Sequence, residues 1–188
     1  MTPFGAIEDL PGRGTLMGNR GILHDGREIR RRWASKAWIA CVLEYKGWRA
    51  AQWEPGHYTP LFFLDEATAL AAGHRPCALC RRADHKRFRS AWGEMPLAEI
   101  DGTLHRERTA SSRPTVAAEE LCDGAMVTLD GSTALLVWRG ALRPWSMAGY
   151  GDSSLPIPDS VALLTPPSML GVLWRGYEPL VHASAGEP

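Results

Sequence analysis

The chain has 188 residues, of which 45% are hydrophobic and 22% charged, and 21 basic residues balance 21 acidic ones. No stretch approaches the roughly 18 consecutive apolar residues of a membrane span, and the N-terminus lacks the pattern of a signal peptide. We therefore expect a folded cytoplasmic protein without a membrane partner, whose four cysteines bind metal, react or pack rather than form disulfides.

The zero net charge hides an uneven distribution. Residues 13–113 carry 18 Lys and Arg against 11 Asp and Glu, whereas the two flanks together carry 3 against 10. Arginines are concentrated in 27–36 and 80–89. Because guanidinium groups pair with phosphates in a bidentate manner, this pattern favours a basic face that binds nucleic acid or another polyanion. The alternative interpretation is a solvated surface.

The first elements are expected to be short. Glycines punctuate residues 14–26, which are typical of a loop with one short strand. Residues 37–53 predict a β-hairpin that turns near Lys46, with Cys41 on its first strand, and 58–64 predict a third strand.

Helices are expected to follow these strands. Asp65 is placed to cap a helix over 66–72, because its side chain can accept from the free amides of the first turn. A second helix is expected over 76–92, since proline suits the first helical position. Cys77 and Cys80 would then lie in its opening turn.

A third helix is predicted over 96–109 and a linker over 111–115. Residues 125–146 are strand-like, with a turn at Asp130, and they begin a tail that we expect to be rich in β-structure up to the C-terminus. The predicted fold class is therefore α+β.

Cys77 and Cys80 form a CxxC pair flanked by arginines. At the start of a helix, thiols three positions apart point the same way, and the helix dipole and nearby cations favour their thiolate forms. This arrangement suits zinc, although two cysteines are only half of a tetrahedral site. A redox pair is the less favoured alternative. A redox motif of this kind directly follows a strand, whereas here a predicted helix and a glycine turn lie between the strand and Cys77.

The segment LFFLDEATALAAGHRPCALCRR, residues 61–82, resembles the second half of the zinc-binding domain of the Ada family of bacterial DNA alkylation-repair proteins. The matching residues are Phe62, Phe63, Ala67, Ala71, Ala72, Gly73, Arg75, Pro76, Cys77, Cys80 and Arg81. In that family two further cysteines, at i and i+4 on an upstream strand, complete the site, and the first accepts a methyl group from a DNA phosphotriester. The resemblance implies that Cys41 is a third ligand, whereas the other matching position is Tyr45, which is not a ligand.

The missing cysteine changes the expected chemistry. A neutral histidine in place of a thiolate removes negative charge from the site, so methyl transfer to a cysteine is in doubt. The fourth ligand is expected to be a histidine, with His24 favoured over His57 and His85. Cys122 is interpreted as a small packed side chain.

Asp101 and His105 lie four residues apart on the third predicted helix. They form either an exposed polar face, which we favour, or an acid–base pair or second metal site.

These observations predict an Ada-like module in residues 1–113, with a small zinc-bound sheet and packed helices, and a β-rich part in 114–188. The leading hypothesis is a zinc protein that binds nucleic acid, with DNA favoured, in DNA repair or modification. Its expected phosphate contacts are Arg30, Arg31, Arg32, Arg75, Arg81 and Arg82. The alternatives are a mononuclear zinc enzyme acting on a phosphodiester or small molecule, or a protein-interaction module. Three protein ligands would favour the enzyme, and four a structural site.

Overall fold

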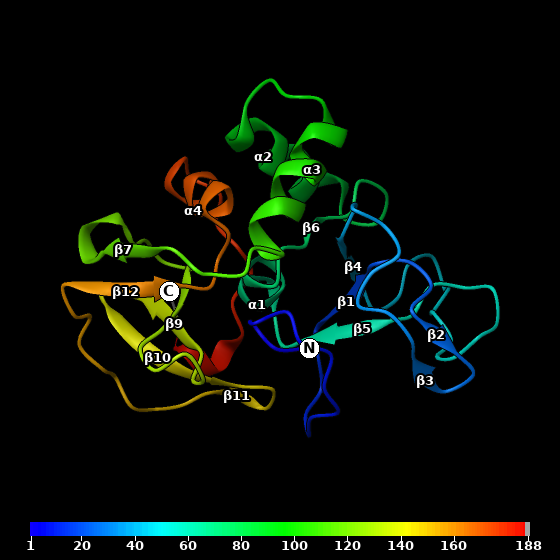
Figure 1. Cartoon of the computed structure of the whole chain (residues 1–188), viewed down its shortest axis with the longest axis horizontal. Coiled ribbons are helices and arrows are strands. Elements are labelled where there is room, and N and C mark those ends of the chain that lie inside the picture. Colours follow the sequence, from blue (N-terminus) through cyan, green and yellow to red (C-terminus); the bar gives the residue numbers. More distant parts are fainter. Residues whose placement is uncertain (187–188) are drawn as a thin grey trace.

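The computed structural model describes residues 1–186, and it confirms the predicted α+β class. Two β-sheets lie on either side of the short helix α1 (Glu66–Ala71), with longer helices above them in the view of Figure 1. Within these residues no helix is long and apolar enough to cross a membrane.

The first sheet has four short strands. Their order is β5 (Leu61–Phe63), β1 (Leu16–Asn19), β4 (Ile39–Val42) and β6 (Arg75–Pro76). All neighbours are antiparallel except β4 and β6, which are parallel. A separate hairpin of β2 (His24–Asp25) and β3 (Glu28–Ile29) lies at the outer end of this half of the molecule (Figure 1).

The second sheet is antiparallel and has six strands. Their order is β11 (Gly149–Tyr150), β10 (Ala141–Ser146), β9 (Leu135–Trp138), β8 (Met126–Thr128), β12 (Ser160–Leu163) and β7 (Thr115–Ala117). The predicted turn at Asp130 is confirmed, because its carboxylate accepts hydrogen bonds from the amides of Ser132 and Thr133 and closes the connection from β8 to β9.

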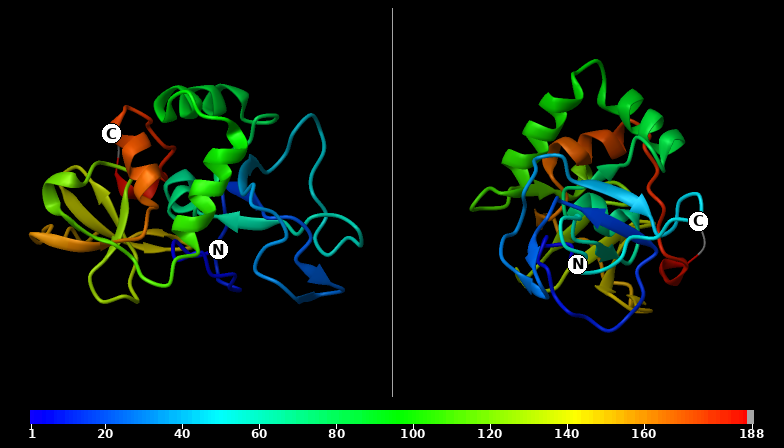
Figure 2. Two further views of the ribbon diagram at one scale, coloured as in Figure 1. Left: turned by 45° about the horizontal axis from the view of Figure 1, so that its top comes forward. Right: turned by 90° about the vertical axis from the view of Figure 1, so that its right-hand side faces the viewer.

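Three further α-helices and two 3-10 helices complete the described chain. They are α2 (Arg82–Trp92), α3 (Leu97–Arg108), α4 (Pro167–Trp174), η1 (Ala118–Glu120) and η2 (Ala183–Ala185). Helix α3, which lies between the two sheets in the left view of Figure 2, confirms the prediction for 96–109. The part after residue 114 is rich in strands, as predicted, but the expectation of β-structure up to the C-terminus was wrong for the segment that forms α4. Four apolar residues of α4 are buried, so its apolar run packs as a helix rather than as a strand: Met169, Leu170, Val172 and Leu173.

The prediction that a helix begins at Pro76 was also wrong. Pro76 lies in β6, and α2 begins at Arg82. The backbone on both sides of Pro76 is used for pairing with the chain around β4: the amide of Arg75 donates to Trp38 O, and that of Cys77 to Ala40 O.

The hairpin predicted over 37–53 is only partly present. Lys46 lies in the left-handed region at φ 52°, and a single bridge joins Tyr45 to Trp48, so the turn is confirmed. The second strand does not form, because β4 pairs with β1 and β6, which come from other parts of the chain.

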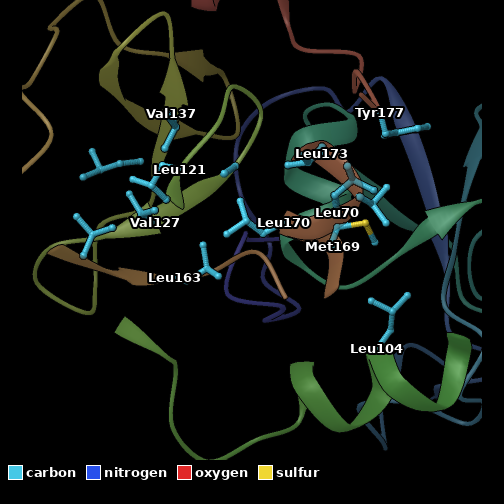
Figure 3. Packing of buried hydrophobic residues seen from close by; sticks show 14 of the residues in the cluster. Leu70, Leu104, Leu121, Val127, Val137, Leu163, Met169, Leu170, Leu173 and Tyr177 are labelled. Atoms are coloured by element: carbon cyan, nitrogen blue, oxygen red, sulfur yellow. The ribbon is translucent and has the colours of Figure 1, made fainter. Parts of the chain in front are cut away.

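The largest hydrophobic cluster joins the two segments that the sequence predicted. Figure 3 shows Leu70 of α1 next to Met169, and the same cluster contains Leu104 of α3 together with Val127 and Leu163 from beyond residue 114. Each large sheet lies within one segment, but the two segments bury their apolar side chains against each other.

Asp65 joins α1 to the C-terminal part of the chain. Its carboxylate caps α1 by accepting from the Thr68 amide at 2.9 Å. It also accepts from the Tyr150 hydroxyl at 2.8 Å and from the His182 amide at 2.9 Å, and the side chain is buried. Buried donors that lose their acceptor retain a desolvation cost that no interaction offsets.

We therefore expect Asp65→Ala to lower the free energy of unfolding by about 3 kcal/mol, measured by urea denaturation. The control is Asp130→Ala, which removes a comparable set of hydrogen bonds at a fully exposed turn and should lower the free energy of unfolding much less. Equal costs for the two variants would contradict a connecting role for Asp65.

Candidate metal centre

Cys41 lies on β4 and faces away from α1. Its register partner on β1 is Met17, and residues at alternate positions of β4 point to opposite faces of the sheet. Ala40 packs with Leu16 on the α1 face, whereas Cys41 packs with Met17 on the other face. The alternation of the strand therefore places one thiol on the outer face of the sheet.

Cys77 and Cys80 reach the same face from the turn between β6 and α2. The Cys77 amide donates to Ala40 O at 3.0 Å, which continues the parallel pairing of β6 with β4 beside Cys41. The Arg81 amide then donates to Cys77 O at 3.2 Å, which closes the turn that brings Cys80 back toward the sheet. The backbone hydrogen bonds of these segments hold the three cysteines together.

The three sulfur atoms lie within 4.8 Å of one another. In a tetrahedral zinc site with Zn–S distances of about 2.3 Å, sulfur atoms are about 3.8 Å apart, so small side-chain adjustments would allow all three to bind one ion. Cys41 and Cys77 are buried, and Cys80 is half-buried. These three cysteines can therefore hold a metal ion.

Without a cation the three thiols share their negative charge unevenly. Hydrogen bonding with Cys41 lowers the pKa of Cys77, and the same interaction, together with burial, raises that of Cys41. Burial and the negative charge on Cys77 raise the pKa of Cys80. A divalent cation would stabilise all three thiolates at once, because coordination deprotonates thiols.

Tyr58 lies next to the cysteines in the same apolar cluster. Its pKa is raised to about 12, chiefly by burial and next by electrostatic interaction with the neighbouring cysteines, Cys41 first. The hydroxyl is therefore protonated at neutral pH. The sequence placed Tyr58 in a strand, and no motif marked it as part of this site.

The structure does not bring any of the three candidate histidines into the cysteine group. Among residues 1–186, the group contains only the three cysteines. His24 is buried with Nδ1 2.6 Å from the Thr59 hydroxyl. His57 is exposed, and His85 donates from Nδ1 to a backbone carbonyl at 3.1 Å. Cys122 is half-buried against the main hydrophobic cluster, away from the other cysteines.

Arg75 and Arg81 do not belong to an exposed basic face, which corrects the prediction for these two residues. Arg75 forms a bidentate ion pair with Asp101 at 2.7 and 2.8 Å. Nη2 of Arg81 lies 2.8 Å from both Glu66 and Asp84. Both guanidinium groups are buried, and carboxylates within the fold offset their charges, although Nη1 and Nη2 of Arg81 make no hydrogen bond among residues 1–186.

The other predicted arginines are exposed. Arg30, Arg31 and Arg32 lie in the loop after β3, and Arg82 begins α2. Of these only Arg30 has a carboxylate partner within residues 1–186, at 2.7 Å from Glu28. Exposed pairs of this kind contribute little to stability, so all four guanidinium groups remain free to contact a polyanion.

Asp101 and His105 do not form an acid–base pair. Asp101 is buried in its ion pair with Arg75, whereas His105 contacts Trp33 edge-on with ring centroids 5.3 Å apart. Burial and the charge of Arg108 lower the pKa of His105, which favours its neutral form. The contacts of both side chains are therefore structural, and they do not form an acid–base pair or a second metal site.

The sequence did not single out a group of cations around Trp38. The guanidinium carbons of Arg20 and Arg108 each lie 3.7 Å from the Trp38 ring centroid. The two arginines come from positions far apart in the chain, so no local pattern could have identified the group.

Comparison with known protein families, with curated proteins and with solved structures gave no match. The resemblance of residues 61–82 to the Ada zinc-binding domain therefore stays a prediction.

Proposed function

We propose that the chain is a zinc-binding protein that binds nucleic acid, with DNA favoured, through its exposed arginines. The group of Cys41, Cys77 and Cys80 is the observation that carries the zinc part of the proposal. Thiolates are soft ligands that favour zinc over magnesium or calcium, and zinc accepts tetrahedral sets of this kind. Bound zinc would join β4 to the turn before α2.

The exposed arginines support the nucleic-acid part of the proposal. Arg31, Arg32 and Arg82 carry free positive charge, and most acidic residues outside ion pairs lie in the flanks of the chain. Phosphate contacts of this kind bind nucleic acid without reading its sequence. The resemblance of residues 61–82 to the Ada family favours a role in DNA repair or modification.

Charge reversal tests this proposal. We expect the triple variant Arg30→Glu, Arg31→Glu and Arg82→Glu to bind fluorescent single- and double-stranded oligonucleotides more weakly than the wild type, whatever their sequence. Each arginine that no longer neutralises a phosphate should reduce the slope of log affinity against log salt by about 0.9 on duplex DNA. Titrations at several salt concentrations measure both effects.

A matched control carries the same change in net charge elsewhere. Arg13, Arg49 and Arg139 are exposed, so their replacement by Glu should leave folding and most of the affinity unchanged. If both triple variants lost the same amount of affinity, the loss would be due to net charge alone and not to contacts made by the three tested arginines. No binding by the zinc-loaded wild type at low salt would refute the nucleic-acid proposal.

A zinc enzyme is the second candidate, because the described residues supply three ligands and tetrahedral zinc takes four. A groove of about 750 Å³ is lined by none of the three cysteines, but Phe62 both lines it and packs against the cysteine cluster. Zinc with an open position supplies Lewis-acid chemistry. The groove would hold the substrate, with Trp53 and Leu43 forming apolar walls.

Cobalt substitution distinguishes a closed site from an open one. For the enzyme we expect the visible absorption of the Co²⁺-loaded protein to change when imidazole or azide is added, because a small ligand would enter the fourth position. An unchanged spectrum at saturating additive would show that the chain closes the site itself and would exclude this candidate.

A further inference from the structure

The group of arginines around Trp38 lies on the face of the four-stranded sheet opposite the cysteines. Trp38 precedes β4, two positions before Ala40 on the α1 face, and its ring contacts buried His74. Arg20 follows β1, and Arg108 ends α3. Guanidinium groups from two separate parts of the chain thus lie against one indole ring.

Arg20 is fully buried. Its Nε donates to His74 Nε2 at 3.1 Å, and its Nη1 donates to Gly5 O at 3.1 Å. Its Nη2 is buried and has no hydrogen-bond partner among residues 1–186. A buried charge with an unpaired donor is costly, and native structures generally supply a partner for it.

The hydrogen-bond partners of Arg20 do not compensate its charge. Burial holds the pKa of His74 well below its usual value, so its ring accepts a hydrogen bond but contributes no negative charge. Burial, and next the charges of Arg108 and Arg32, lower the pKa of Arg20 to about 9. The surroundings therefore oppose the positive charge that the guanidinium carries.

Arg108 and Arg113 have carbonyl partners instead of carboxylates. Arg108 donates to Gly73 O and to Lys36 O, both at 2.6 Å. Arg113 donates to two backbone carbonyls at 3.2 Å. Among residues 1–186, none of Arg20, Arg32, Arg108 and Arg113 lies within 4.0 Å of a carboxylate, unlike buried Arg75 and Arg81.

A small recess opens at this group. Its walls include Arg32, Trp33, Trp38, Arg108 and Arg113, and no acidic residue of the described chain lines it. Arg20 does not line the recess itself but lies close behind its wall: a Cβ built on Gly5, which does line the recess, would lie 3.7 Å from the unpartnered Nη2 of Arg20. The enclosed space is about 10 Å³, which is room for one water-sized atom.

We propose that this recess is a binding site for a phosphate group. One phosphoryl oxygen enters the recess, where the positive charge of Arg20 behind the wall attracts it, while the other oxygens stay at the mouth beside Arg32 and Arg113. A phosphate dianion offsets more than one of the uncompensated cations, and arginine forks pair with its oxygens. A carboxylate carries a single charge and should bind more weakly.

This site goes beyond the proposed function, because it takes one phosphate group whether that group is free or belongs to a nucleic acid. Inorganic phosphate is therefore the first probe, and oligonucleotides with a 5′-phosphate or a 5′-hydroxyl are the second. Calorimetric titration at matched ionic strength measures affinity, with acetate as the monoanionic comparison. The Arg20 Nε–H resonance in the ¹H–¹⁵N spectrum reports on the buried cation behind the recess.

We expect saturable phosphate binding that shifts the Arg20 Nε–H resonance, and weaker binding of acetate. Since Arg20 is buried, its replacement risks unfolding, so exposed Arg32 is changed instead. Arg32→Gln should weaken phosphate binding about tenfold, because it removes one charge-assisted contact. Arg139→Gln, at an exposed arginine that does not line the recess, is the matched control and should bind phosphate as the wild type does.

The outcomes separate the two proposals. Phosphate binding without oligonucleotide binding would support the phosphate site in the recess and refute the nucleic-acid proposal. A preference for the 5′-phosphorylated oligonucleotide that disappears in Arg32→Gln would identify a nucleic-acid end as the source of the phosphate. Absence of phosphate binding, or binding that leaves both the Arg20 resonance and the Arg32→Gln affinity unchanged, would overturn the recess site.

Discussion

Cys77→Ser or Cys80→Ser should abolish zinc binding and should remove most of the free energy of unfolding. Zinc bound at sites assembled by folding contributes apparent free energies on the order of 10 kcal/mol, comparable with the whole stability of a typical domain. The three cysteines come from β4 and from the turn before α2, so the ion would join segments that are far apart in the chain. Removal of one ligand leaves an incomplete site and two thiols without a shared cation.

Metal content by mass spectrometry and thermal unfolding by circular dichroism measure this effect. The wild type should contain about one zinc per chain and lose it to a strong chelator with a large fall in melting temperature. Cys41→Ser should behave like the other two variants, because Cys41 belongs to the same group. Cys122→Ser is the control and should retain the metal.

A metal-free wild type whose melting curve does not change with Cys77→Ser would exclude a zinc site. Release of the metal by Cys122→Ser alone would instead show that the ligands have been wrongly assigned. Metal affinity should also fall as the pH is lowered, because protons compete with zinc for the thiolates.

Arg75→Met should lower the free energy of unfolding by about 3–5 kcal/mol, because it leaves the Asp101 carboxylate buried without its cation. The pair is bidentate, with distances of 2.7 and 2.8 Å, and both side chains are almost completely buried. It joins β6 to α3, so its removal should loosen the segment that carries the cysteines.

The double variant Arg75→Met and Asp101→Leu should recover much of that stability, because no buried charge then remains unpaired. Arg82→Gln is the control for a neighbouring exposed arginine and should change stability by less than about 0.5 kcal/mol. Urea denaturation of the four proteins completes the comparison. If Arg75→Met left stability unchanged and weakened DNA binding, the exposed role that the sequence predicts for Arg75 would be correct.

The errors in the predicted elements have a common cause. Pro76 satisfies the local preference for a helix start, but strand pairing with β4 uses the adjacent amides. The apolar run of α4 fits either a strand or a helix, and packing against α2 and α3 selects the helix. Local preferences are worth less than the burial and pairing that tertiary contacts provide.

The sequence by itself determined the features whose partners lie within a few residues. The Asp65 cap, the turn at Asp130 and the close spacing of Cys77 and Cys80 depend on short-range geometry, and all are present in the structure. The α+β class follows from the alternation of such local patterns.

Only the tertiary structure decided which charges are paired. Arg75 and Arg32 look alike in the sequence, yet Arg75 meets a carboxylate 26 positions away, whereas Arg32 lines a recess without one. Trp38 likewise contacts both Arg20 and Arg108, which lie near opposite ends of the segment 1–113. Burial and charge pairing depend on contacts between distant segments, and those contacts exist only once the two sheets and α1 have packed together.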